Sequence, residues 1–226
     1  MRDSATCGFA FRAPMTPPEG WNSAANDAII SDMSESKRGK LVVISGPSGA
    51  GKTSICDALL ERIPNSRWSV SVTTRPRRGE EVDGGAYRFI SRAEFEQMIA
   101  NDELLEHAEY LGNLYGTPRG PVETAVASGE VTIMEIDVQG GAQVAEKAPD
   151  SVRVFVLPPT MDTLKARLEG RHTESEALQR KRLAEADGEI AFARNSGHYQ
   201  YFITNDILSD SIQRVLDIIQ QETENA

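Results

Sequence analysis

Cysteine, long apolar runs and basic residues are all scarce in this 226-residue chain. Its only cysteines, Cys7 and Cys56, are too few for a disulfide framework and fit a reducing compartment. No apolar run approaches the length of a membrane span. Lys and Arg number 24 against 34 Asp and Glu, which gives a formal net charge of -10. Such an acidic balance argues against a general nucleic-acid-binding protein. We therefore expect a cytoplasmic protein with neither nucleic acid nor membrane as a partner.

The first 38 residues differ in composition from the rest. They contain Pro14, Pro17 and Pro18 among scattered Ser, Asn and Gly, and show no sustained apolar period. Their apolar run Phe9-Ala10-Phe11 is too short for a secretory signal. We predict that residues 1–38 form a disordered N-terminal extension. Translation from Met15 or Met33 instead of Met1 remains an alternative.

The most informative stretch reads LVVISGPSGAGKT, from Leu41 to Thr53. Leu41–Ser45 is apolar and rich in β-branched residues, which predicts a buried strand of a parallel sheet. A helical pattern follows and ends at Pro64. The eight residues between strand and helix match the phosphate-loop pattern G-x-x-x-x-G-K-[ST], and they are Gly46, Pro47, Ser48, Gly49, Ala50, Gly51, Lys52 and Thr53.

This order of strand, glycine-rich turn and helix N-terminus creates a nest of N–H groups for an anion. Lys52 is expected to reach the β- and γ-phosphates of ATP, and the Thr53 hydroxyl is expected to bind Mg²⁺. The alternative is an ordinary glycine-rich turn. Because every motif position and both flanks agree, the sequence predicts a protein that binds a nucleoside triphosphate.

Buried-strand patterns recur later in the chain. Val131–Ile136, Val152–Leu157 and Tyr201–Thr204 are separated by helical patterns, which is typical of a parallel sheet covered on both faces. The predicted fold class is therefore α/β, a P-loop NTPase fold with a parallel sheet core. The section from about residue 69 to residue 117 breaks this alternation. We interpret it as an inserted substrate lobe.

Local patterns within the insertion are less uniform. Trp68–Thr74 and Tyr87–Ile90 predict short strands. Leu104–Tyr110 fits either a strand or a helix, and Gly112–Pro118 is predicted to be a turn-rich connection. The capping-box sequence Ser91-Arg92-Ala93-Glu94 predicts a helix start.

Polar residues of the insertion offer a site for the phosphoryl acceptor. Arg75, Arg77 and Arg78 could grip a phosphate by paired N–H···O bonds, although a solvated charged turn is an equal alternative. Tyr87 and Tyr115 could donate O–H groups to the same phosphate, but an isolated Tyr is more often half-buried core. Glu106 could accept two hydrogen bonds from a guanine edge. Taken alone, it is more simply an exposed helix residue.

Together these motifs resemble one family. The segments TTR, PRRGE, YRF, LLEHAEYLGNLYGT, MEIDVQGG and RLEGRHTESEALQRKRL resemble guanylate kinase, which phosphorylates GMP from ATP. The resemblance extends from about Lys40 to Glu222. It implies a domain at 39–226 with a core at 39–68 and 118–226, a GMP-binding insertion at about 69–117 and a helical lid at about 171–194.

The resemblance also implies roles for single residues. Lys52, Arg171 and Arg182 would be catalytic, the two arginines closing with the lid over the transferred phosphoryl group. Asn205 would lie near the adenine, and Asp137 would join Thr53 at the Mg²⁺ ion. The residues implied to bind GMP are Ser71, Arg75, Arg78, Tyr87, Glu106, Tyr115, Thr117 and Glu135, with Ser71, Glu106 and Thr117 reading the guanine.

Two departures from the family pattern affect these assignments. Pro76 follows Arg75 directly, so either Arg77 or Arg78 could be the second phosphate ligand. His172 stands where the lid motif usually has glycine, which could restrict the lid backbone. Rival interpretations are a kinase with another acceptor and a catalytically silent interaction module. The sequence leaves open the choice between GMP and dGMP, and between a monomer and a homodimer.

Overall fold

A five-stranded parallel sheet forms the centre of the computed structural model, which describes residues 39–170 and 176–224. Its strand order is β2-β7-β1-β8-β9, and every neighbouring pair is parallel. The strands are β1 (Leu41–Ser45), β2 (Ser66–Trp68), β7 (Val131–Glu135), β8 (Val152–Leu157) and β9 (Tyr201–Thr204). This arrangement confirms the predicted α/β fold with a parallel sheet core.

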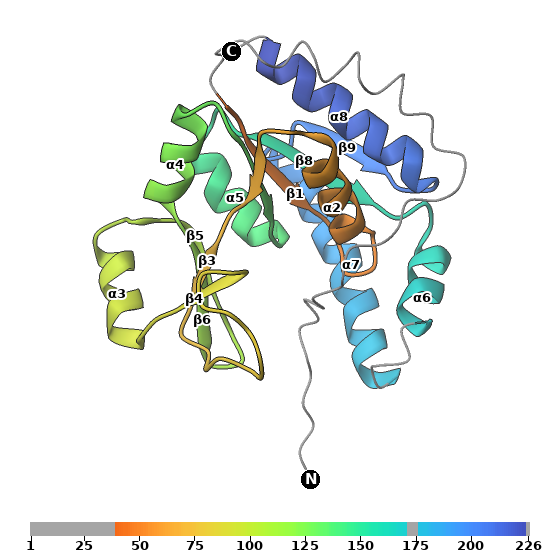
Figure 1. Cartoon of the computed structure of the whole chain (residues 1–226). Coiled ribbons are helices and arrows are strands. Elements are labelled where there is room, and N and C mark those ends of the chain that lie inside the picture. The colour runs from red at the N-terminus through yellow and green to blue at the C-terminus, as the bar shows by residue number, and fades with distance from the viewer. Residues whose placement is uncertain (1–38, 171–175, 225–226) are drawn as a thin grey trace.

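Helices cover both faces of this sheet (Figure 1). They are α2 (Lys52–Arg62) and α8 (Leu208–Glu224) on one face, and α4 (Arg119–Ala127) and α5 (Val138–Lys147) on the other. Successive β1 side chains point to opposite faces. Val42 and Ile44 pack with the α2 and α8 side, whereas Val43 packs with Val122 of α4 and Val144 of α5. Burial on both faces explains why β1 reads as an unbroken apolar run.

Two further helices follow β8. Helix α6 (Met161–Glu169) begins where the side chain of Thr160 accepts a hydrogen bond from the Thr163 N–H. Helix α7 (Glu176–Ser196) packs against α6 through Ala186, which contacts Leu164 and Leu168. In Figure 1, the residues of the predicted insertion lie on the left of the view and α6 lies on the right, with α7 between them.

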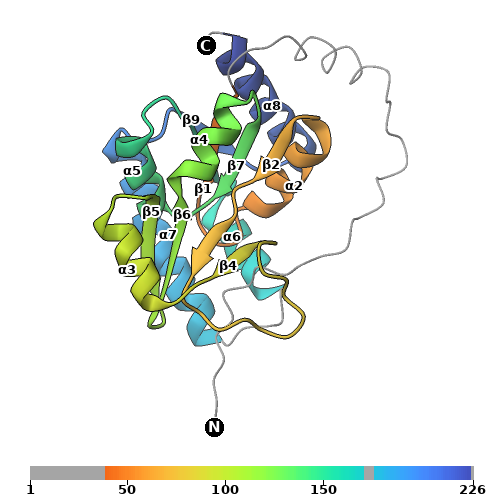
Figure 2. The ribbon, with the colours of Figure 1, turned by 60° about the vertical axis from the view of Figure 1, so that its left-hand side comes forward.

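A second, mixed sheet is formed by residues of the predicted insertion, between Ser71 and Pro118 (Figure 2). Its order is β4-β3-β6-β5, with β3 (Ser71–Thr73), β4 (Tyr87–Phe89), β5 (Leu104–Tyr110) and β6 (Asn113–Pro118). Helix α3 (Arg92–Ala100) packs on it through the buried ring of Phe95. The predicted capping box is confirmed, because Ser91 Oγ accepts from the Glu94 N–H and Glu94 Oε2 accepts from the Ser91 N–H.

Two local predictions for the insertion were wrong. Trp68–Thr74 is not one strand, because β2 ends at Trp68 in the central sheet and β3 begins at Ser71 in the second sheet. Gly112–Pro118 is not a turn-rich connection, since Asn113–Pro118 forms the strand β6 between β3 and β5. In both cases long-range pairing overrides the local pattern. The ambiguous segment Leu104–Tyr110 is a strand.

Some sequence-based predictions lie outside the described residues. These are the N-terminal extension at 1–38, with Met1, Met15 and Met33, and the first lid residues, with Arg171 and His172. Among the helices at 39–170 and 176–224, none combines the length and the apolar character needed to cross a membrane.

Candidate functional site

The phosphate-loop segment leaves β1 and turns directly into α2. Gly46, Gly49 and Gly51 have φ angles of 145°, 88° and 96°, a region that side-chain-bearing residues rarely adopt. A Cβ on Gly46 would also lie 2.3 Å from the carbonyl oxygen of Val156, so only glycine lets the loop pass β8 this closely. No side chain caps α2 at Gly51. The start of α2 therefore has the form of an anion-binding helix N-terminus.

The side chain of Lys52 lies over the first residues of the phosphate loop. Its Nζ donates to the carbonyl oxygens of Gly46 at 2.7 Å and Pro47 at 3.2 Å. The ammonium group is thus held above the backbone where the motif predicts phosphate oxygens.

Acidic residues from the end of β7 lie beside the loop. Thr53 Oγ1 donates to Glu135 Oε1 at 3.2 Å. Asp137 caps α5, because its Oδ1 accepts from the N–H groups of Gln139 at 2.9 Å and Gly140 at 2.8 Å. Because β1 and β7 are parallel neighbours, their carboxyl ends bring Thr53, Glu135 and Asp137 to one edge of the sheet.

The oxygen donors at this edge fit a magnesium ion bound mainly through a nucleotide. Across residues 39–170 and 176–224, no group of three or more His, Cys, Asp or Glu side chains is arranged to hold a metal ion by itself. Mg²⁺ commonly uses one or two protein oxygens together with phosphates and water. The hydroxyl of Thr53 and the carboxylate of Asp137 are donors of that kind.

Helix α7 brings a guanidinium group to the loop. Arg182 Nη1 donates to Ser48 Oγ at 2.6 Å, so this predicted lid arginine contacts the loop in the described structure. Glu189, two turns further along α7, is half-buried. Burial raises the pKa of Glu189 to about 7, with further raising by Asp137 and Glu185 and an opposing effect of Lys52. Sequence reasoning missed Glu189, because nothing distinguishes it from other acids of this charged helix.

Asn205, which the resemblance places near the adenine, is buried against the loop with only 4% of its surface exposed. Its Nδ2 donates to the Ala50 carbonyl at 2.8 Å. Arg167 of α6 holds the Asn205 backbone carbonyl through a 3.0 Å hydrogen bond. The described contacts of Asn205 therefore support the phosphate loop. Nothing in the sequence pattern indicates the part played by Arg167.

The three residues predicted to read guanine lie together on the second sheet. Thr117 Oγ1 donates to Glu106 Oε1 at 2.7 Å, and the hydroxyls of Ser71 and Thr117 are 3.4 Å apart. Thr117 faces Glu106 directly in the pairing of β5 with β6, next to a register irregularity between Leu104 and Glu106. Glu106 lies in a strand and only 7% of it is exposed. Its interpretation as an exposed helix residue is therefore wrong.

Burial dominates the electrostatics of Glu106. It raises the pKa of this carboxyl to about 7, hydrogen bonds from Thr117 oppose the rise, and Asp137 adds to it. Burial thus disfavours the charged form of this carboxyl more than its hydrogen bonds with Thr117 favour it.

We expect Glu106→Gln to be more stable than the unchanged protein at pH 8, by on the order of 3 kcal/mol. The folded pKa of about 7 lies above the ordinary value of 4.5. The protonated form therefore favours folding, and that contribution is lost as the pH rises through 7. The difference should shrink on acidification toward pH 5. Urea unfolding of both proteins at pH 8 and pH 5 checks this, and a gap that does not vary with pH would contradict it.

Arg75 is the buried centre of the predicted phosphate-binding group. Its Nη1 and Nη2 donate to Glu81 at 3.0 and 2.9 Å, and its guanidinium carbon lies 5.5 Å from the ring centroid of Tyr87. The Tyr87 and Tyr115 rings meet edge to face at 6.0 Å. Arg75, Tyr87 and Tyr115 are thus brought together.

The other two arginines of this segment, Arg77 and Arg78, are exposed. The Arg78 backbone N–H donates to Glu81 Oε2 at 2.8 Å. The alternative of a solvated charged turn therefore fits Arg77 and Arg78, but not the buried Arg75. Sequence reasoning missed Glu81, although an acid a few residues after an arginine cluster is a signal for such a pair.

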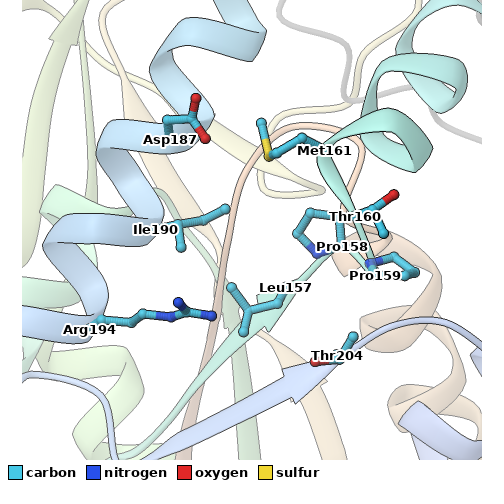
Figure 3. A pocket seen from close by; sticks show the side chains of 9 residues that line it. All are labelled: Leu157, Pro158, Pro159, Thr160, Met161, Asp187, Ile190, Arg194 and Thr204. Carbon is cyan, nitrogen blue, oxygen red and sulfur yellow. The ribbon is translucent and has the colours of Figure 1, made fainter.

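A cavity of about 280 Å³ lies where the end of β8 meets α6, α7 and β9. Figure 3 shows Pro158 on the segment that leads into α6, with Ile190 and Arg194 projecting from α7. None of the predicted nucleotide ligands lines it. The anion site predicted at the phosphate loop is formed by backbone N–H groups and needs no deep cavity.

The fold and this loop define a P-loop nucleotide-binding protein of the α/β class. The family model for guanylate kinase matches residues 38–222. A guanylate kinase of Synechocystis sp. is 43% identical over 187 residues, covering 83% of this chain and 96% of the relative. One from Symbiobacterium thermophilum is 48% identical over 190 residues, covering 84% and 89%.

A solved structure gives the same result. The crystal structure of guanylate kinase from Anaplasma phagocytophilum matches with a TM-score of 0.63 and 34% identity, covering 83% of this chain and 87% of that one. The chain belongs to the guanylate kinase family. It is therefore an enzyme of the kinase class that binds nucleotides, which agrees with the resemblance found in the sequence.

Proposed function

We propose that this chain transfers the γ-phosphoryl group of ATP to GMP, and also to dGMP, giving ADP and the nucleoside diphosphate. Membership of the guanylate kinase family supports the reaction. The choice of GMP as the phosphoryl acceptor rests on one observation, the grouping of Ser71, Glu106 and Thr117. Thr117 donates to Glu106 at 2.7 Å, and the hydroxyls of Ser71 and Thr117 are 3.4 Å apart.

On the donor side, the loop from Gly46 to Thr53 would hold the phosphates of ATP. Lys52 would exchange its bonds to the Gly46 and Pro47 carbonyls for bonds to phosphate oxygens. Mg²⁺, held by Thr53 and Asp137 together with the nucleotide, would supply charge neutralisation. The Asn205 contact with Ala50 supports the loop in this role.

On the acceptor side, Glu106 would read the guanine. Its carboxylate can accept from both N1–H and the 2-amino group of guanine, whereas the N1 of adenine is itself an acceptor. A buried acceptor facing another acceptor is costly, so AMP would be rejected. The GMP phosphate would be bound by Arg75, Arg78, Tyr87 and Tyr115. Glu135 would be a further residue that binds GMP.

Catalysis would rest on positioning and charge neutralisation. The GMP phosphate is already an anion at neutral pH, so no strong general base is required. We expect the insertion at 69–117 and the lid at 171–194 to close on the core, with Arg171 and Arg182 at the phosphoryl group. Closure would exclude water and so prevent ATP hydrolysis.

The setting of this reaction is part of the same proposal. We expect the enzyme to work in the cytoplasm, because its two cysteines suit a reducing compartment. We expect it to act as a monomer or a homodimer, with nucleotides and not nucleic acid as its partners.

A coupled ADP-release assay with ATP and Mg²⁺ tests this function. GMP, AMP, UMP and CMP are offered separately, and we expect turnover with GMP alone. Turnover with another acceptor would leave the phosphate loop in its role and overturn the assignment of Ser71, Glu106 and Thr117. No turnover with any acceptor would support either a catalytically silent interaction module or a lid altered by His172.

A further inference from the structure

One face of α5 lies against the edge strand of the second sheet. Gly140, Gln143 and Lys147 are spaced by three and four residues and so share this face. Strand β5 is the last strand in its sheet, with β6 as its strand partner. Its outer backbone groups therefore meet α5 rather than another strand.

At His107, the side chain of Gln143 makes the two backbone hydrogen bonds that a neighbouring strand would otherwise make. Its Oε1 accepts from the His107 N–H at 3.0 Å, and its Nε2 donates to the His107 carbonyl at 3.0 Å. One side-chain amide thus satisfies both outward backbone groups of the residue that follows Glu106. Lys147 adds a second connection, a 2.7 Å bond from its Nζ to the Leu104 carbonyl.

Glu106 lies between these two connections. Thr117 binds one carboxylate oxygen, Oε1. The other oxygen, Oε2, lies 3.3 Å from where a Cβ on Gly140 would be, so the carboxylate passes close to the α5 backbone. The distance between β5 and α5 is therefore one determinant of where the Glu106 oxygens lie, together with the bond from Thr117.

We propose that Gln143 is a positioning residue for guanine recognition, which holds β5 at the distance from α5 that places the Glu106 carboxylate for the guanine edge. The proposal rests on the proposed role of Glu106. Two N–H donors must meet two carboxylate oxygens at once, and such paired geometry tolerates shifts of only about 0.5 Å. The two Gln143 bonds restrain the backbone one residue away from that carboxylate.

Gln143→Met tests the proposal, because methionine is similar in length and makes neither bond. The probes are GMP and IMP, since the hypoxanthine of IMP keeps N1–H and lacks the 2-amino group. We expect kcat/KM for GMP to fall about tenfold, kcat/KM for IMP to fall much less, and KM for ATP to stay within about twofold. The GMP preference should move toward that of Glu106→Gln.

Gln97→Met is the matched control, because Gln97 is exposed on α3 of the same insertion. We expect it to keep the GMP preference of the unchanged protein. If Gln143→Met does not fold, Gln143→Asn serves instead, because it keeps an uncharged amide that is one methylene too short to make both bonds to His107, and the same change in the GMP preference is expected.

The outcomes separate this proposal from the function on which it rests. An unchanged ratio of kcat/KM for GMP and IMP in the Gln143 variant, even with a lower melting temperature, would reduce Gln143 to a structural role and overturn the proposal. Failure of the unchanged protein to use GMP would instead overturn the proposed function.

Discussion

Arg182→Ala is expected to lower kcat about 10³-fold, by analogy with the loss of an arginine finger in related phosphoryl transfer. Arg182 reaches the phosphate loop from α7 through its 2.6 Å bond to Ser48. Its charge would lie where negative charge develops as the γ-phosphoryl group moves. Steady-state ADP release at saturating ATP and GMP measures the effect, and thermal unfolding reports whether α7 still packs.

Lys181→Ala is the matched control for Arg182→Ala. Lys181 is the preceding residue of α7, its side chain is 70% exposed, and it pairs with Glu185 of the same helix. Removing an exposed helical ion pair costs little, so kcat should stay within about twofold. A near-normal kcat in Arg182→Ala would contradict a catalytic role for this arginine and would leave it only a structural contact with Ser48.

The substitution Lys52→Met is also expected to have a large effect, a fall in kcat of about 10²–10³-fold. The methionine side chain can still pack over the loop, but it brings no charge to the β- and γ-phosphates. The lost bonds to Gly46 and Pro47 should matter little for stability, because the Lys52 side chain is only half-buried. Single-turnover transfer from labelled ATP to GMP isolates the chemical step.

Lys165→Met provides the comparison for Lys52→Met. Lys165 lies on α6 with 59% of its side chain exposed and pairs with Glu169. This variant loses the same charge from the whole molecule and should retain full activity. Equal losses in the two lysine variants would mean that net charge, and not the position of Lys52, determines the rate.

The phosphate loop could be predicted from the sequence because its parts are contiguous. Strand, glycines, Lys52 and helix follow one another, so a local pattern contains the whole geometry. The strands β7 and β8 were equally visible, since burial on both faces leaves continuous apolar runs. The apolar pattern of β9 was visible too, although this strand lies at the edge of the sheet and Phe202 is exposed. The order of the five strands, β2-β7-β1-β8-β9, could not be predicted in the same way, because the general preference for right-handed crossovers allows several orders.

The insertion was harder to predict, because its contacts join residues far apart in the chain. Nothing local shows that Trp68 and Ser71 belong to different sheets, or that Asn113–Pro118 lies between β3 and β5. The burial of Glu106 depends on Thr117 across the ladder and on α5 behind it. Pairing partners, rather than propensities, decide such features.

Side-chain partners of the predicted ligands were also invisible in the sequence. Arg75 could be singled out by composition, but its bond to Glu81 requires the turn that brings the two residues together. Asn205 was placed near the nucleotide by resemblance, whereas its bond to Ala50 joins residues 155 positions apart. Such contacts exist only in the folded chain.

The register irregularity between Leu104 and Glu106 limits how the length of this hairpin can vary during evolution. Side chains alternate between the two faces of a strand, so one residue inserted or deleted between Glu106 and Thr117 within the ladder would turn one of them to the opposite face. The tip at Leu111 and Gly112 lies beyond the pairing of Tyr110 with Asn113. Relatives with longer or shorter hairpins are therefore expected to differ at that tip and to keep the segment from Leu104 to Glu106 unchanged in length.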